Sequence, residues 1–148
     1  MKIADALRGV RQLGIDSAPL IYLVEKHPTY FDQVVFIMRH IHNGSIDGVA
    51  SVLALTEVLV HPLRTGNQTL AQDYENILLN STGFRLVPVD TNVARQSADL
   101  RARYNLRTPD ALHIATALEA GCEAFLTNDL ALKRVTEVRV LALDELEL

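Results

Sequence analysis

Hydrophobic and polar positions follow two different periods along the 148-residue chain. Short apolar runs bounded by turn residues are typical of buried strands, and they occupy residues 12–16, 47–52, 84–90, 123–129 and 137–143. Apolar positions three or four residues apart predict helices at residues 17–26, 27–44, 51–63, 67–81, 90–105 and 106–121. Strands that alternate with helices predict an α/β fold, here three α/β/α layers around a mostly parallel sheet of four to five strands. We expect residues 1–148 to form one such domain, with residues 1–12 as an N-terminal extension before the first strand.

The helix predicted at residues 106–121 has clear end signals and an apolar middle. Thr108 can cap its start, Pro109 suits the first helical position, and Gly121 suits the C-terminal stop. In the same way, Ser51 can cap the helix at 51–63 and Pro62 can stop it. The helix at 106–121 is therefore expected to be buried, yet a carboxylate, Asp110, lies in its first turn.

Composition sets the class of protein. Hydrophobic residues make up 49% of the chain and charged residues 22%, which is typical of a globular protein rather than a disordered one. No uncharged stretch approaches the about 20 residues of a transmembrane helix, so we expect no membrane partner. The N-terminus lacks the apolar core of a signal peptide, and the single cysteine, Cys122, excludes an internal disulfide and a cysteine-based zinc site. These features favour a cytoplasmic protein.

Charge alone does not suggest nucleic acid as a partner, because the net charge is −4. Four arginines are nevertheless clustered before and at the start of the helix at 106–121, namely Arg95, Arg101, Arg103 and Arg107. Taken alone, such a cluster is most simply a solvated helix face.

Four acidic residues stand in unusual settings. Asp16 and Asp129 each follow an apolar strand, Glu57 lies among leucines and valines, and Asp110 begins a buried helix. Any one aspartate is most simply a turn former or a helix cap. Glu57 is harder to explain in this way, because an ionised carboxylate in an apolar helix costs several kcal/mol unless something pairs with it. We expect no local basic partner for Glu57, Asp110 or Asp129.

A metal cation could supply the missing positive charge. The carboxyl ends of parallel strands meet at one edge of the sheet, which would bring such acids together. Oxygen ligands without cysteine indicate a hard ion, Mg²⁺ or Mn²⁺, which could activate a water molecule for phosphodiester hydrolysis. His113 lies one turn after Asp110, and we expect it to be hydrogen-bonded in the core or to Asp110 rather than to ligate metal.

The order and settings of these acids resemble PIN-domain ribonucleases. The matching stretches are "GID", "ALTEVL", "LRTPDALHIATA" and "FLTND", and they extend from about Leu13 to the C-terminus. The nearest likeness is to the VapC-type toxins of toxin–antitoxin pairs, which usually begin with the first strand and lack the extra residues 1–12. The resemblance implies a Mg²⁺- or Mn²⁺-dependent endoribonuclease that cleaves single-stranded or structured RNA, forms a homodimer and is blocked by a cognate antitoxin protein.

Carried over residue by residue, the resemblance assigns Asp16, Glu57, Asp110 and Asp129 as the catalytic and metal-binding acids. Ser17 matches a Ser/Thr position beside the first acid, and Thr127 and Asn128 match the polar pair before the last one. These three residues are expected to position the substrate. For a nuclease, Arg101, Arg103 and Arg107 also become candidates for phosphate contacts, and Arg107 is counted with the substrate-binding residues.

Three alternatives remain open. One is a PIN-like RNA-processing nuclease that is not a toxin, and another is a degenerate PIN domain that only binds RNA or protein. The third is a non-catalytic Mg²⁺-binding module such as a phospho-receiver domain, which usually has two acids at the first strand and a lysine after a late one. Here Asp16 is a single acid and Leu130 follows Asp129, while Ala18 stands where a haloacid-dehalogenase-like phosphatase would need an aspartate.

Overall fold

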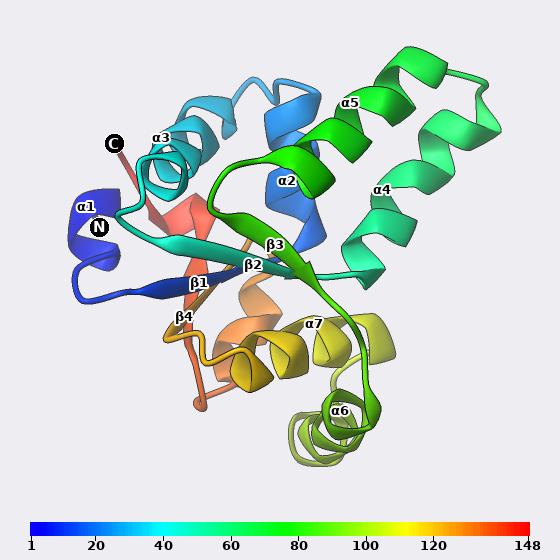
Figure 1. Cartoon of the computed structure of the whole chain (residues 1–148). Helices are drawn as coiled ribbons and strands as arrows, with labels where there is room; N and C mark the ends of the chain where they lie inside the picture. The colour runs from blue at the N-terminus through cyan, green and yellow to red at the C-terminus, as the bar shows by residue number, and fades with distance from the viewer.

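The computed structural model describes all residues 1–148 and contains one five-stranded, fully parallel sheet (Figure 1). The strand order is β3-β2-β1-β4-β5, so the first strand of the chain lies at the centre. The strands are β1 (Gln12–Ile15), β2 (Asp47–Ser51), β3 (Phe84–Val87), β4 (Ala124–Thr127) and β5 (Arg139–Ala142). The register pairs Gly14 with Val49 on one side and with Phe125 on the other. The expected α/β architecture and parallel sheet are confirmed.

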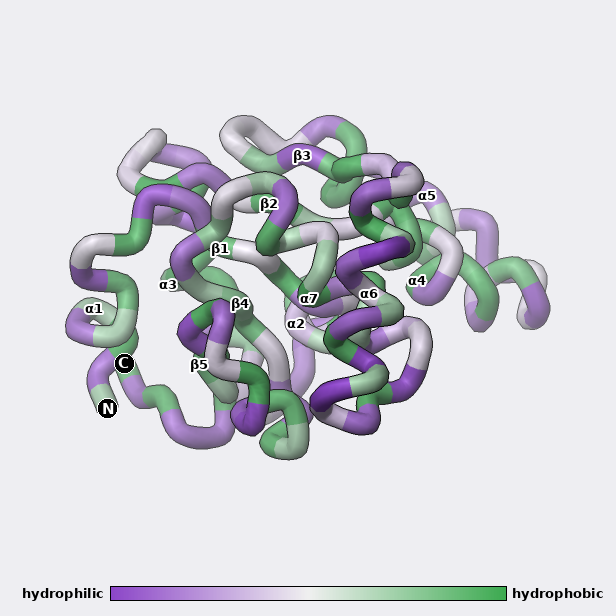
Figure 2. Tube along the Cα trace, turned by 90° about the horizontal axis from the view of Figure 1, so that it is seen from below, coloured by the Kyte–Doolittle hydropathy of each residue, from purple (hydrophilic) through white to green (hydrophobic).

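Helices cover both faces of the sheet, which completes the three layers (Figure 1). One layer holds α2 (Ser17–Val24), α3 (Phe31–His42) and α5 (Gln68–Asn80), and the other holds α6 (Thr91–Tyr104) and α7 (Thr108–Glu119). Helix α7 packs directly on β1 and β2, and α6 packs on α7. The trace of α6 is mostly hydrophilic, as suits an outer helix (Figure 2).

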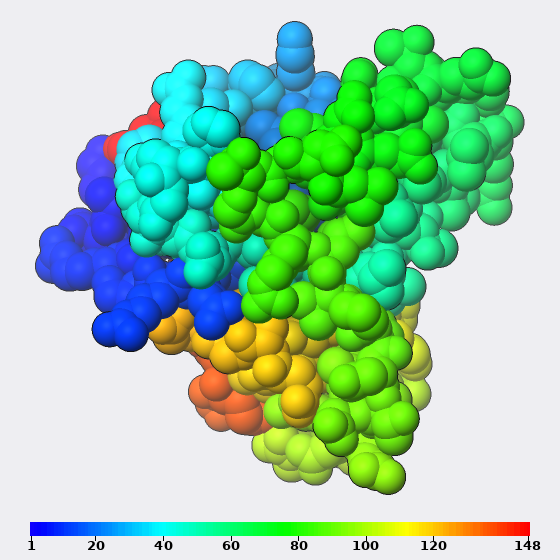
Figure 3. All heavy atoms as spheres, in the orientation of Figure 1, coloured from blue at the N-terminus to red at the C-terminus, as the bar shows by residue number.

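Helices α4 (Leu53–Arg64) and α5 form a hairpin that projects beyond the rest of the domain (Figures 1 and 3). Its α4 arm carries two of the large apolar side chains that remain exposed, Val60 and Leu63. None of the helices in the structure has the length and the apolar character required to span a membrane.

Several element ends differ from the sequence-based expectation for identifiable reasons. Helix α4 continues through Pro62 to Arg64, and the hydroxyl of Thr65 donates to the carbonyl groups of His61 and Pro62 in its last turn. Strand β3 ends at Val87 because Pro88, which follows it, has no N–H to donate to a sheet. Helix α7 has Arg107 rather than Thr108 at its N-cap, and no side chain caps it.

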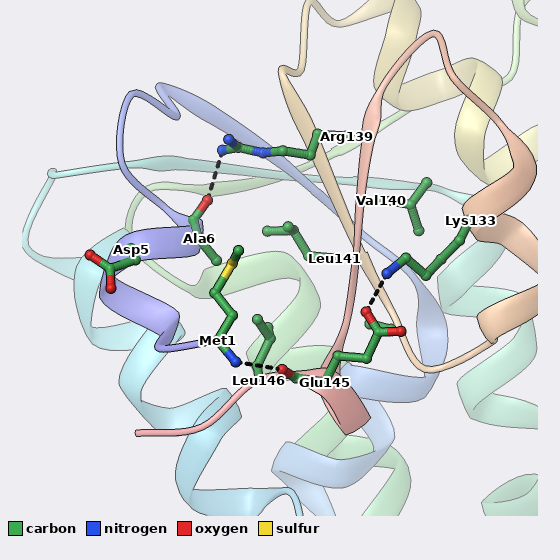
Figure 4. Close-up of a pocket in the computed structure, with 10 residues that line it drawn as sticks. Met1, Asp5, Ala6, Lys133, Arg139, Val140, Leu141, Glu145 and Leu146 are labelled. Carbon is green, nitrogen blue, oxygen red and sulfur yellow. Dashed lines mark hydrogen bonds and ion pairs between the residues drawn. The ribbon is translucent and has the colours of Figure 1, made fainter.

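The N-terminal extension is part of the core. It ends at Arg11, because β1 already begins at Gln12, and it contains a short helix that the sequence pattern did not reveal, α1 (Ile3–Ala6). Backbone hydrogen bonds join Ile3 and Met1 to Glu147 near the C-terminus. Between these termini and β5 lies a mainly apolar cavity in which Lys133 pairs with Glu145 (Figure 4). The extension thus closes the β5 side of the domain.

A glycine lets α7 approach the central strand. A Cβ atom on Gly14 would lie 2.6 Å from the Cβ of Ala117 and 3.0 Å from the ring of Phe125. Neither neighbour can move freely. The Cβ of Ala117 is fixed to the backbone of α7, and Phe125 is fully buried in β4. The absence of a side chain at residue 14 therefore sets the distance between β1 and α7.

We predict that Gly14→Ala destabilises the domain by about 1–3 kcal/mol, the usual cost of overpacking a core. Chemical denaturation measures the free energy of unfolding. The double variant Gly14→Ala/Ala117→Gly is the control, because it removes the closest contact: it should lose less stability than the sum of the two single variants. Additive losses would show that the approach of α7 is not limited by this contact.

Candidate functional site

All four acids predicted from the sequence line one cleft at the carboxyl edge of the sheet. Its volume is about 220 Å³, and few of its lining side chains are apolar. Besides Asp16, Glu57, Asp110 and Asp129, the lining residues are Ser17, Ala18, Tyr22, Arg107, Thr127 and Asn128. The cleft thus also contains Ser17, Thr127, Asn128 and Arg107, which the sequence assigns to substrate binding.

Asp16 is the most constrained of the acids. It lies between β1 and α2 and is only 8% exposed. Its Oδ1 accepts the backbone N–H of Ser17 at 2.8 Å, and its Oδ2 accepts the hydroxyl of Thr127 at 2.8 Å. Burial raises the pKa of Asp16, although the nearby His113, the Thr127 hydroxyl and the Ser17 N–H each oppose the increase. The carboxylate is therefore held in place at a cost in desolvation.

Glu57 and His113 form a contact that was not expected. His113 is buried in α7, and its Nε2 is hydrogen-bonded to Oε1 of Glu57 on α4. The same Nε2 lies 3.8 Å from Oδ1 of Asp16. The hydrogen bond to His113 lowers the pKa of Glu57 despite partial burial. The expectation that His113 is hydrogen-bonded in the core is confirmed, but its partner is Glu57 and not Asp110.

Asp110 has the local basic partner that we expected to be absent. The Nε of Arg107 lies 3.0 Å from Oδ2 of Asp110, and the two residues are three positions apart at the start of α7. Spacing of this kind brings side chains together at a helix terminus, so the sequence itself contained the signal. The Arg107 side chain remains 77% exposed, which leaves it accessible to an anion.

The last acid and its neighbours form the other side of the cleft. Asp129 is exposed, and its Oδ1 accepts the N–H of Ala131, so it also caps the short 3₁₀ helix at Leu130–Arg134. The Asn128 amide donates to the hydroxyl of Tyr22 at 3.2 Å and accepts the N–H of Asp144 at 3.1 Å. Tyr22 was not singled out in the sequence, where nothing marks a helix-face tyrosine as part of a site.

The remaining arginines of the sequence cluster do not line the cleft. Arg101 donates to the carbonyl of Leu106, and Arg103 pairs with Asp99 and Glu137 on the outer surface of α6. Of the three proposed phosphate contacts, the structure places only Arg107 beside the acids.

A model of the PIN domain matches residues 15–138, which is most of the chain and includes all four acids. The chain belongs to the PIN-domain family. The family expected from the sequence is confirmed, whereas no curated protein matches the sequence.

Several solved complexes contain a chain with a fold similar to that of this chain. A chain of VapBC2 from Rickettsia felis, bound to a promoter DNA fragment, is 14% identical, with a TM-score of 0.69 over 88% of this chain and 98% of its own. A chain of FitAB bound to the IR36 DNA fragment is 19% identical, with a TM-score of 0.71 over 93% and 98%. A chain of a toxin–antitoxin complex from Klebsiella pneumoniae is 18% identical, with a TM-score of 0.62 over 89% and 97%. At these identities the likeness shows a shared fold.

The ligand atoms in the cleft of this PIN domain suit a hard cation that keeps several of its water molecules better than a cation enclosed by protein ligands alone. The cleft offers carboxylate oxygens and no thiolate, as Mg²⁺ and Mn²⁺ prefer. However, no three Asp, Glu, His or Cys side chains are arranged to hold a metal ion together, and Asp110 is paired with Arg107 and Glu57 with His113. The assignment of Asp16, Glu57, Asp110 and Asp129 as four metal ligands stays a prediction. Mg²⁺ usually keeps several waters and takes one or two carboxylates, which this cleft can provide.

We predict that Asp16→Asn raises the melting temperature in EDTA at neutral pH. A pKa raised by folding means that ionised Asp16 opposes folding, and that this loss of stability appears as pH rises through the folded pKa. The amide keeps an oxygen for the Ser17 N–H and removes the charge. For a domain of this size, each kcal/mol corresponds to about 2–4 °C.

Asp129→Asn is the matched control, because this acid is exposed and should tolerate the same exchange with little change in melting temperature. The advantage of Asp16→Asn should shrink as pH falls, since protonation then neutralises Asp16 in the parent as well. A lower melting temperature for Asp16→Asn at neutral pH would show that its hydrogen bonds outweigh the desolvation of its charge.

Proposed function

We propose that this PIN domain is a Mg²⁺- or Mn²⁺-dependent endoribonuclease that cleaves single-stranded RNA and is the toxin of a toxin–antitoxin pair. The observation that carries the proposal is the convergence of Asp16, Glu57, Asp110 and Asp129 on one cleft, with an exposed arginine beside them. PIN domains are typically nucleases, which supports hydrolysis. The structures with the same fold come from toxin–antitoxin complexes, which supports a toxin with a protein partner.

Asp16 and the other three acids have different roles in this mechanism. Asp16 would be the fixed ligand, because three groups from α2, β4 and α7 surround it, and Glu57, Asp110 and Asp129 would complete the binding of a hydrated ion. Such an ion, when bound, would lower the pKa of a bound water and stabilise negative charge on the phosphate. Arg107 can bind a phosphate oxygen with guanidinium N–H groups that Asp110 does not use. Ser17 would help to hold the carboxylates of Asp16 and Glu57, and Thr127 would hold that of Asp16. Asn128 would keep Tyr22 at the edge of the cleft through the hydrogen bond to its hydroxyl.

Partner binding is the second part of the proposal. An antitoxin that presents a basic side chain, best an arginine, would pair with the acid cluster and block it. The exposed apolar residues of the α4–α5 hairpin, Val60 and Leu63, offer contact area for a protein partner or for a second copy of the chain. We include a homodimer in the proposal on this basis.

We predict that purified protein cleaves single-stranded RNA only with Mg²⁺ or Mn²⁺. Asp16→Asn and Asp110→Asn should each lower the rate at least ~100-fold, because losing a metal ligand removes both the ion and the activated water. Cleavage of a labelled RNA, followed on denaturing gels with and without EDTA, measures this. Asp47→Asn is the matched control, since Asp47 is an exposed aspartate at the opposite end of the sheet. Equal cleavage in excess EDTA would rule out the metal mechanism.

We also predict that expression of the chain alone slows growth of a bacterial host and that Asp110→Asn abolishes this effect. Growth curves with matched protein levels make the comparison. Restoration of growth by co-expression of a small protein encoded next to this one would identify the antitoxin. A parent that cuts RNA in the tube but leaves growth unaffected would instead support an RNA-processing nuclease, and a parent that binds Mn²⁺ without cutting RNA would support a binding module.

A further inference from the structure

His113 is a buried polar residue whose contact with Glu57 has no role in the mechanism proposed above. Its side chain is 1% exposed and lies in the middle of α7. Nε2 contacts Glu57 and lies 3.8 Å from Asp16, whereas Nδ1 has no hydrogen-bond partner. The imidazole thus presents one nitrogen to two acids and the other to a part of the core that offers no polar contact.

This environment fixes where the hydrogen of the ring lies. A hydrogen on Nδ1 would be a buried donor without an acceptor, which costs about 1–3 kcal/mol. It would also leave the Nε2 lone pair facing the oxygen of Glu57. The neutral ring therefore carries its hydrogen on Nε2, and the imidazolium also has a hydrogen there. In either form, His113 donates to Glu57.

The contact also links two elements that are distant in the sequence. Glu57 comes from α4, and its side chain is about one-third exposed, so packing alone does not fix its carboxylate. His113 comes from α7, which lies close against β1 at Gly14. The hydrogen bond therefore joins a partly exposed carboxylate to a buried residue of a helix that packs on the central strand, next to Asp16.

We infer that His113 is the positioning residue that holds the Glu57 carboxylate beside Asp16 in the orientation for binding a divalent cation. The inference rests on the proposed metal-dependent function and adds a residue to it. Donors that orient ligating carboxylates typically contribute 10–100-fold to metal affinity or activity. His113 itself ligates nothing in this arrangement, since its Nε2 lone pair is taken up by the hydrogen.

The test is a set of substitutions at residue 113 with Mn²⁺ affinity as the readout. The amide nitrogen of glutamine can take the place of Nε2, whereas that of asparagine is one methylene too short to reach Glu57. Isothermal titration calorimetry with Mn²⁺ and no RNA measures binding independently of activity. We expect His113→Asn and His113→Leu to bind Mn²⁺ about 10–100-fold more weakly than the parent, and His113→Gln to recover most of the loss.

Two controls separate positioning from stability. Ile114→Ala removes a fully buried side chain from the same helix, so it should lower the melting temperature without changing Mn²⁺ affinity. In a Glu57→Gln background, His113→Asn should cause little further loss of affinity, because the group that His113 orients is already altered. This comparison does not require the leucine variant to fold.

The inference is overturned if His113→Asn binds Mn²⁺ within about twofold of the parent, or if glutamine is no better than asparagine. A parent that binds no Mn²⁺ would overturn both this inference and the metal-dependent mechanism. If the parent binds Mn²⁺ with the expected dependence on residue 113 but leaves RNA intact, the role of His113 stands and the nuclease proposal fails.

Discussion

The charge of Asp16 has to be accommodated where the fold excludes most of the water. A buried carboxylate without partners costs several kcal/mol, so the groups around it must be in place when the chain folds. They come from three separate elements: the N–H of Ser17 at the start of α2, the hydroxyl of Thr127 at the end of β4, and the ring of His113 on α7. The central position of β1 makes this possible, because β4 is its direct neighbour and α7 packs on it. The packing of the sheet and the geometry of the acid cleft thus depend on the same contacts.

Helix α7 has the largest part in that arrangement. Its first turn carries Asp110, its second carries His113, and its body fits against β1 because residue 14 has no side chain. Its N-terminus also has a positive partial charge that favours the carboxylate of Asp110. The cost of burying an acid-bearing helix is therefore offset locally by Arg107 and the helix dipole.

Most of the fold and part of the site could be predicted from the sequence. Hydrophobic periodicity placed every strand to within a few residues, and the rule that parallel strands end at one edge brought Asp16 and Asp129 together correctly. The pair of Arg107 and Asp110 could have been found, since it follows from helical spacing alone. The contact of His113 with Glu57 could not, because these residues are 56 positions apart and meet only through the packing of α4 near α7.

The charges in the cleft bear on how the proposed RNA substrate could bind. Four carboxylates face one exposed guanidinium and one buried imidazole, so the cleft has an excess of negative charge. RNA is a polyanion, and its phosphate would be repelled by such a surface unless positive charge were added. In the proposed function, a divalent cation held by these acids would offset the excess negative charge and would allow a phosphate group to approach them.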